Sequence, residues 1–281
     1  ISPAVGRSSH SQMKGNRTVE GLNSPMKSGS TPEAGALTVG SLFAGIGGFE
    51  LGFEATGRFE TRWQVECDPY ATEVLEKHWP DVQRHDDVCT WPNETTEPVD
   101  VLIGGFPCQD ISDAGKGAGL DGQRSGLFYE LMRIVRVVGP KYVVLENVAA
   151  LFTRGMGAVL GSLSSHGYDA EWEVVSASSV GAPHRRDRVF IIGYMADSNG
   201  SRLQGRGLPR QCTGKRVAGA GIQESPWSQP DADVRRVANG VPKRVDRLRC
   251  LGNAIVPQVA QVVAERLLEI HDARASDVSD S

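Results

Sequence analysis

One cysteine, Cys108, lies where a thiol could be activated. It belongs to the run GGFPCQDIS at 104–112, directly after the apolar stretch 99–103, which predicts a buried strand. A strand that leads at once into a turn places the thiol at the carboxyl edge of a parallel sheet, where α/β enzymes bind their ligands. Pro107 fixes its own φ angle and donates no hydrogen bond, so the turn is stiff. Cys108 is therefore a candidate nucleophile, although the residue alone fits a small buried hydrophobic side chain equally well.

Charged side chains stand at the ends of two further predicted strands. Glu146 follows the apolar run at 141–145, and a carboxyl group buried there would retain its proton because ionising it away from water is costly. Arg186 and Arg188 precede a predicted strand at 189–193. Arginine clusters usually lie in solvent, but these two fall beside the expected position of the thiol. The set predicts a nucleophile assisted by a proton donor and by cations.

A glycine-rich turn at 44–48 follows an apolar strand at 37–43 and leads into an amphipathic helix. Such a turn allows backbone amides to approach a nucleotide-like ligand, although a tight turn without a ligand looks the same. Glu66 ends the next predicted strand about 20 residues later, where an acid can accept hydrogen bonds from a ribose. Asp87, near a further strand end, could accept one from an adenine amino group. Glu50 stands where a dinucleotide-binding motif has its third glycine, which disfavours a nicotinamide oxidoreductase.

Composition excludes several classes of protein. The 281 residues are 40% hydrophobic, enough to bury a large core, and they contain no apolar run long enough to span a membrane and no secretory signal segment. The five cysteines are odd in number and include no C-x-x-C pair, which argues against a disulfide framework and against a zinc site. We therefore expect a cytoplasmic protein with reduced thiols and no metal.

The chain divides by composition into four parts. Residues 1–36 are rich in Ser, Gly, Pro and Asn and predict a disordered tail, as does the polar stretch 272–281. Residues 37–195 with 247–271 predict an α/β domain, whereas 196–246 contains few aliphatic residues and too little apolar surface for a core. Residues 202–249 carry 11 Lys and Arg against 4 Asp and Glu in a chain of net charge −4. This asymmetry suggests a nucleic-acid-binding segment; a solvated basic loop is the alternative.

Five motifs in order resemble those of the cytosine carbon-5 DNA methyltransferases. They are FAGIGG at 43–48, GGFPCQDIS at 104–112, ENV at 146–148, HRRDRVFIIG at 184–193 and GNAIVP at 252–257. The resemblance implies a doubly wound, Rossmann-like methyltransferase sheet that binds S-adenosylmethionine, with a separate small, irregular target-recognition segment. It also implies that the substrate is double-stranded DNA and that the protein is a monomer that binds neither a membrane nor a metal. Where the enzyme belongs to a restriction system, a cognate restriction endonuclease is the implied partner.

The resemblance assigns roles to individual residues. Cys108 would add to carbon 6 of a flipped-out cytosine, Glu146 would protonate ring nitrogen 3, Arg188 would hold oxygen 2 and Arg186 would support the loop. The implied cofactor-binding residues are Phe43, Ala44, Gly45, Gly47, Glu66, Cys67, Asp87, Val88, Pro107, Leu127, Asn253 and Ala254. The implied DNA-binding residues are Gln109, Ser112, Arg235, Arg236, Lys243 and Arg244.

Two departures from the family pattern accompany the match. His184 stands where the family usually has glutamine, and 197–243 is short for a recognition region. The arginine-rich stretch that normally follows that region is not recognisable, so the two basic pairs at 235–236 and 243–244 are its candidate substitutes. Two other functions share these motifs: an RNA (transfer RNA) cytosine-5 methyltransferase on the same scaffold, and a non-catalytic nucleic-acid-binding relative.

Overall fold

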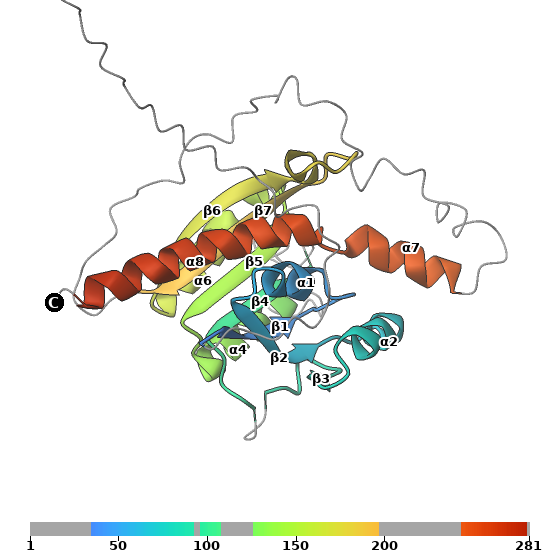
Figure 1. Cartoon of the computed structure of the whole chain (residues 1–281), viewed down its shortest axis with the longest axis horizontal. Helices are drawn as coiled ribbons and strands as arrows, with labels where there is room; N and C mark the ends of the chain where they lie inside the picture. The colour runs from blue at the N-terminus through green and yellow to red at the C-terminus, as the bar shows by residue number, and fades with distance from the viewer. Residues whose placement is uncertain (1–34, 93–95, 108–125, 197–242, 280–281) are drawn as a thin grey trace, which may run out of the picture.

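The computed structural model of the chain describes residues 35–92, 96–107, 126–196 and 243–279 (Figure 1). Cys108, Gln109, Ser112, Arg235 and Arg236 therefore lie outside the described residues. The same holds for the predicted N-terminal tail up to residue 34 and for most of the predicted recognition segment.

Seven strands form one sheet in the order β3-β2-β1-β4-β5-β7-β6. The strands from β1 to β5 pair in parallel, whereas β7 runs antiparallel to both β5 and β6. This open α/β sheet confirms the predicted fold class. The strand bounds are β1 Leu37–Leu42, β2 Phe59–Val65, β3 Gln83–His85, β4 Val101–Gly105, β5 Tyr142–Val148, β6 Tyr168–Ser176 and β7 Asp187–Met195.

Helices cover both faces of the sheet, because successive side chains of a strand point to opposite faces and the central strands are apolar on both. On β4, Leu102 packs with α4 and α6, while Val101 and Ile103 pack with α1 and α8 (Figure 1). The helix bounds are α1 Gly48–Glu54, α2 Pro69–His78, α4 Gly126–Val138, α5 Leu151–Arg154, α6 Met156–Ser165, η2 Ala177–Val180, α7 Arg244–Asn253 and α8 Pro257–Ser279.

The close packing of α1 against α8 depends on a glycine. A Cβ atom on Gly52 would lie 2.3 Å from the carbonyl oxygen of Pro257 and 2.5 Å from the Cβ of Ala260. Only a residue without a side chain allows the two helices to approach this closely. α1 directly follows the glycine-rich turn, so this contact also fixes the position of that turn.

The prediction of a disordered tail at 272–281 is wrong for most of its length, because α8 continues to Ser279. No glycine or proline interrupts the sequence after residue 270, so nothing ends the helix there. Polar contacts hold this end to the sheet: the Tyr142 hydroxyl lies 3.0 Å from His271 Nδ1, and Arg274 donates to the carbonyl oxygen of Met195 at 2.7 Å. The tail was predicted from its polar composition, which does not reveal such contacts.

The boundary predicted at 246–247 also shifts. α7 begins at Arg244, within the segment assigned to target recognition, and lies beside α2 at one end of α8 (Figure 1). None of the helices in the described part of the chain is long and apolar enough to cross a membrane.

Candidate functional site

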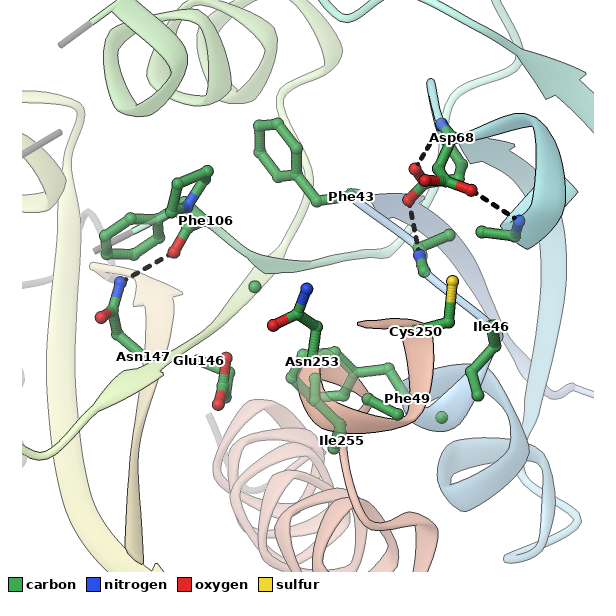
Figure 2. A pocket seen from close by; sticks show the side chains of 18 of the residues that line it. Phe43, Ile46, Phe49, Asp68, Phe106, Glu146, Asn147, Cys250, Asn253 and Ile255 are labelled. Atoms are coloured by element: carbon green, nitrogen blue, oxygen red, sulfur yellow. Dashed lines mark hydrogen bonds between the residues drawn. The ribbon is translucent and has the colours of Figure 1, made fainter. Parts of the chain in front are cut away.

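A cavity of about 560 Å³ opens where β1, β2, β4 and β5 end at the carboxyl edge of the sheet (Figure 2). Further wall comes from α7 and the α7–α8 junction, with smaller contributions from α1, α2 and the start of β7. In Figure 2, Glu146 and Asn147 lie at one end of the cavity and Asp68 at the other, with Asn253 and Cys250 between them. The lining residues are Phe43, Ala44, Gly45, Ile46, Gly48, Phe49, Glu66, Asp68, Ala71, Gly105, Phe106, Pro107, Glu146, Asn147, Val148, Arg188, Arg249, Cys250, Asn253, Ala254 and Ile255.

The carboxylate of Glu66 is held in a fixed orientation beside the glycine-rich turn. One oxygen accepts a hydrogen bond from the backbone N–H of Gly45 at 2.7 Å, and the other accepts one from the backbone N–H of Asp68 at 2.8 Å (Figure 2). The turn itself needs left-handed backbone, with φ of 58° at Gly45 and 84° at Gly47. A carboxylate oriented in this way retains acceptor capacity for the hydroxyls of a sugar.

At the opposite end, Glu146 forms an ion pair with Arg188. The distance from Arg188 Nε to Glu146 Oε1 is 2.8 Å, and the glutamate side chain is only 12% exposed. Burial raises the pKa of Glu146, and the charges of Arg188 and Arg186 offset this increase only in part. Gly105, its partner on β4, makes room for the carboxylate, since a Cβ there would lie 3.0 Å from Glu146 Oε2. Glu146 is therefore suited to hold or donate a proton at the cavity wall.

Asn147 connects the end of β5 to the turn that leads to Cys108. Its side chain is buried and donates to the carbonyl oxygen of Phe106 at 2.9 Å, while its own Oδ1 accepts from the backbone N–H of Val148 at 2.8 Å (Figure 2). The sequence motif ENV contained this residue, but we assigned no role to it. The structure shows that it fixes the backbone next to Pro107.

Arg186 binds backbone carbonyl groups, whereas Arg188 binds Glu146. The Arg186 guanidinium donates to the carbonyl oxygens of Gly252 and Ala254, both at 2.8 Å, and burial lowers its pKa. Its backbone has a positive φ of 29°, so it departs from the extended course of β7. Arg186 is not among the lining residues; it holds the junction that carries Asn253 and Ala254 into the cavity.

The structure brings together many of the residues predicted from the sequence. The predicted residues that line the cavity are Phe43, Ala44, Gly45, Glu66, Pro107, Glu146, Arg188, Asn253 and Ala254. Those described but outside the lining are Gly47, Cys67, Asp87, Val88, Leu127, Arg186 and Lys243. Arg244 begins α7, and its side chain lies outside the described part of the structure.

These outer residues make other contacts. Asp87 accepts a hydrogen bond from the backbone N–H of Cys89 at 2.8 Å. Val88 is buried in the hydrophobic core, and Leu127 packs against the surface of that core. Cys67 is an exposed residue at the start of the turn after β2, but partial shielding of its thiol from water, together with the nearby Glu66 carboxylate, raises its pKa.

Sequence reasoning missed Asp68 and, on α7, Arg249 and Cys250. Asp68 caps α2 by accepting from the backbone N–H groups of Tyr70 and Ala71 at 3.0 and 3.1 Å. An Asp followed by Pro at the start of a helix is a recognisable capping signal, so this residue could have been found. Arg249 and Cys250 carried no such signal.

The lining fits the nucleoside-containing cofactor that the resemblance implies. A volume of about 560 Å³ is in the range of small-molecule sites, and the oriented Glu66 carboxylate, the Phe43 ring and the Asn253 amide are suitable contacts for a sugar and a base. Among the residues described, no cluster of three or more His, Cys, Asp or Glu could hold a metal ion.

Comparison with known proteins adds independent information. The sequence model of a family described as C-5 cytosine-specific DNA methylase matches residues 37–232. The type II methyltransferase M.Bsp6I from Bacillus sp. (strain RFL6) is 37% identical over 164 residues, covering 56% of this chain and 52% of that protein. M.BsuFI from Bacillus subtilis is 38% identical over 169 residues, covering 57% and 40%. The chain thus spans about half the length of the curated relatives it matches. A solved structure of a candidate DNA modification methyltransferase encoded within an E. coli prophage has 29% identity and a TM-score of 0.48, covering 57% of this chain and 47% of that one.

Proposed function

The chain belongs to the C-5 cytosine-specific DNA methylase family, and on this basis we propose that it transfers a methyl group from S-adenosylmethionine to carbon 5 of a flipped-out cytosine in double-stranded DNA. The observation that carries the proposal is the ion pair of Glu146 with Arg188 at the end of β5. Glu146 pairs in register with Gly105 of β4. In the sequence Cys108 follows Gly105 by three residues, so the candidate nucleophile comes directly after the strand that neighbours Glu146.

The cofactor would occupy the end of the cavity that contains Glu66. Bound S-adenosylmethionine supplies a sulfonium methyl group, which is electrophilic enough for carbon 5 of an activated cytosine to attack. Glu66 would accept hydrogen bonds from the ribose, the Phe43 ring would pack against the nucleoside, and Asn253 would contact it from the α7–α8 junction. The resemblance assigns the adenine to Asp87 and Val88, with Gly47, Cys67 and Leu127 around them. All five lie outside the lining, so their contact with the base would require the cavity to extend toward them.

Cys108 would supply the nucleophile. Carbon 5 of cytosine is a poor nucleophile, so the thiolate first bonds to carbon 6, which makes the electron pair of the 5,6 double bond available at carbon 5. Carbon 5 then takes the methyl group. A base removes the carbon 5 proton, and its electron pair restores the double bond as the bond from carbon 6 to sulfur breaks. An ordinary thiol with a pKa near 8.5 is mostly protonated at neutral pH, so nearby positive charge is needed to favour the thiolate.

Glu146 would donate a proton or a hydrogen bond to ring nitrogen 3 during the addition. Its buried position favours the protonated form, and the proton neutralises negative charge that would otherwise develop on the ring. Arg188, which orients this carboxyl group, would also hold oxygen 2 of the base. None of these atoms is accessible inside a duplex, so the target base must be flipped out.

We assign DNA recognition to 197–243 and to the residues next to the nucleophile, Gln109 and Ser112. The segment concentrates Lys and Arg, which contact phosphates, and few of its side chains could reach base edges. In the described residues, Lys243 forms an ion pair with Glu73 and lies over the Tyr70 ring, so its contribution to DNA binding would require a change of partner. A cognate restriction endonuclease is the partner expected for a type II system.

A trapping experiment tests the proposal. Duplex DNA containing 5-fluorocytosine should form a stable covalent complex with the protein, because fluorine cannot leave from carbon 5 as a proton does. Cys108→Ser should abolish both the complex and methyl transfer, whereas Cys89→Ser, which changes an exposed thiol outside the cavity, should retain them. A fully active Cys108→Ser protein, or labelled-methyl transfer to transfer RNA with none to DNA, would contradict the proposal.

A further inference from the structure

The helix α7 forms one wall of the cavity without being anchored by an apolar core. Arg249 and Cys250 on this helix and Asn253 at its end contribute to the lining. Among its described side chains none is fully buried, and the apolar residues Val245 and Leu251 are 77% and 58% exposed. Burial of apolar surface therefore contributes little to holding α7 in place.

Charged groups hold α7 against α2 instead. Arg249 forms an ion pair with Asp68, and Lys243, the residue before the helix, forms one with Glu73. Lys243 also lies over the ring of Tyr70, 5.5 Å from its centroid. α2 and α7 are thus joined by two ion pairs, of which the Arg249–Asp68 pair lies at the cavity itself.

The Arg249–Asp68 pair is connected to the carboxylate that would bind the ribose. Asp68 uses Oδ1 to cap α2, Oδ2 to bind Arg249, and its backbone N–H to hold Oε1 of Glu66. Arg249 therefore contacts the residue that orients Glu66, and it lies on the same helix as Cys250 and Asn253, which also line the cavity. A break in this pair would open the cavity on the side where the proposed cofactor lies.

We propose that Arg249 is a positioning residue that closes the cofactor cavity by holding α7 against the start of α2. α7 acts as a strap: it opens to admit or release the cofactor and closes when Arg249 pairs with Asp68. This inference rests on the proposed binding of S-adenosylmethionine. Arg249 is 54% exposed, and an ion pair with one partner in solvent stabilises a contact only weakly, so removal of this pair should shift the balance between closed and open strap by about two- to fivefold.

The test measures the dissociation of S-adenosylhomocysteine from the full-length protein by rapid mixing with excess unlabelled ligand. Arg249→Ala should raise the dissociation rate about two- to fivefold, whereas Arg249→Lys should restore part of the difference. Arg247→Ala is the matched control, since it removes the same charge from the same helix and Arg247 has no ion pair within the described residues. High salt should accelerate release from the wild type and have less effect on Arg249→Ala, because salt screens the pair.

A second readout does not need the cofactor. In the free protein, backbone amides of α7 should exchange with solvent faster in Arg249→Ala than in Arg247→Ala, while the melting temperatures of the two variants stay equal. Suppose that the wild type binds S-adenosylhomocysteine, but Arg249→Ala and Arg247→Ala show the same dissociation rate and the same amide exchange rates in α7. The strap is then disproved, and the proposed function stands. If the wild type does not bind S-adenosylhomocysteine at all, the proposed function fails first.

Discussion

A carboxyl group in the core, that of Glu50 on α1, should make the stability of the fold depend on pH. Its side chain is 0% exposed, and Oε1 accepts one hydrogen bond from Gln64 Nε2 at 3.1 Å. Its Oε2 and the hydroxyl of Ser41 are both buried, and the Ser41 hydroxyl, like Gln64, favours the charged form of the carboxyl group. Burial dominates over the hydrogen bonds and raises the pKa of Glu50 to about 7. Nearby charges come from Glu54 on α1, which raises the pKa further, and from Arg84 on β3, which binds Gln64.

The size of the effect follows from this shift. Because the pKa is higher in the folded state than the ordinary value of 4.5, the folded protein binds the proton more tightly than the unfolded chain. Stability from this group is fully present below pH 4.5 and is lost as the pH rises through 7. Each pKa unit corresponds to about 1.4 kcal/mol, so the complete loss amounts to about 3 kcal/mol. Between pH 5 and 8 the loss is about 2–3 kcal/mol, since the unfolded carboxyl is already partly ionised at pH 5.

Urea unfolding at several pH values measures this loss. Glu50→Gln retains the shape and the contact with Gln64 but cannot ionise, so the wild type should lose about 2–3 kcal/mol more than the variant between pH 5 and 8. Glu76→Gln on the exposed side of α2 is the control, and its free energy of unfolding should follow that of the wild type. Parallel curves for the wild type and Glu50→Gln over this range would refute the reasoning.

Three further predictions concern packing, DNA binding and the N-terminal residues. Gly52→Ala should lower the free energy of unfolding by about 1–3 kcal/mol in urea titrations, because its Cβ would overlap α8, whereas Gly161→Ala, with open space around its Cβ, should not. Replacing Arg235 and Arg236 by Ala should weaken DNA binding and reduce the slope of log affinity against log salt, measured by fluorescence anisotropy, by roughly one unit for each phosphate that these arginines bind. Deleting residues 1–34 should leave the melting temperature and methyl transfer nearly unchanged, since their composition offers no apolar surface to pack.

Several strands, the helix after the glycine-rich turn and the meeting of the motifs at one sheet edge could be predicted from the sequence, because apolar runs and glycine turns are local patterns. Apolar runs predicted strands that became β1, β4 and β5, and acids at strand ends, Glu66 and Glu146, both line the cavity. Parallel strands bring their carboxyl ends to the same edge of a sheet, so residues far apart in the chain meet there.

α7 could not be predicted in the same way. Its sequence, RVDRLRCLGN, is mostly polar, and its apolar residues Val245, Leu248 and Leu251 are exposed rather than directed at the core. The contacts that position it come from α2 and from Arg186, which are distant in the sequence. A periodicity argument detects a helix that buries an apolar face, whereas α7 is held by charge.

The antiparallel direction of β7 explains how residues at the beginning of a strand reach the site. In a parallel strand the first residue lies at the edge opposite to the ligand, so Arg188 would be far from Glu146 if β7 ran parallel to β5. Because β7 runs antiparallel, Arg188 pairs in register with Val148 at the end of β5, and its guanidinium reaches Glu146. The sequence showed the arginines at a strand entrance but not the direction of that strand. An arginine at the beginning of a strand therefore lies at the carboxyl edge of a parallel sheet only if its own strand runs antiparallel to the others.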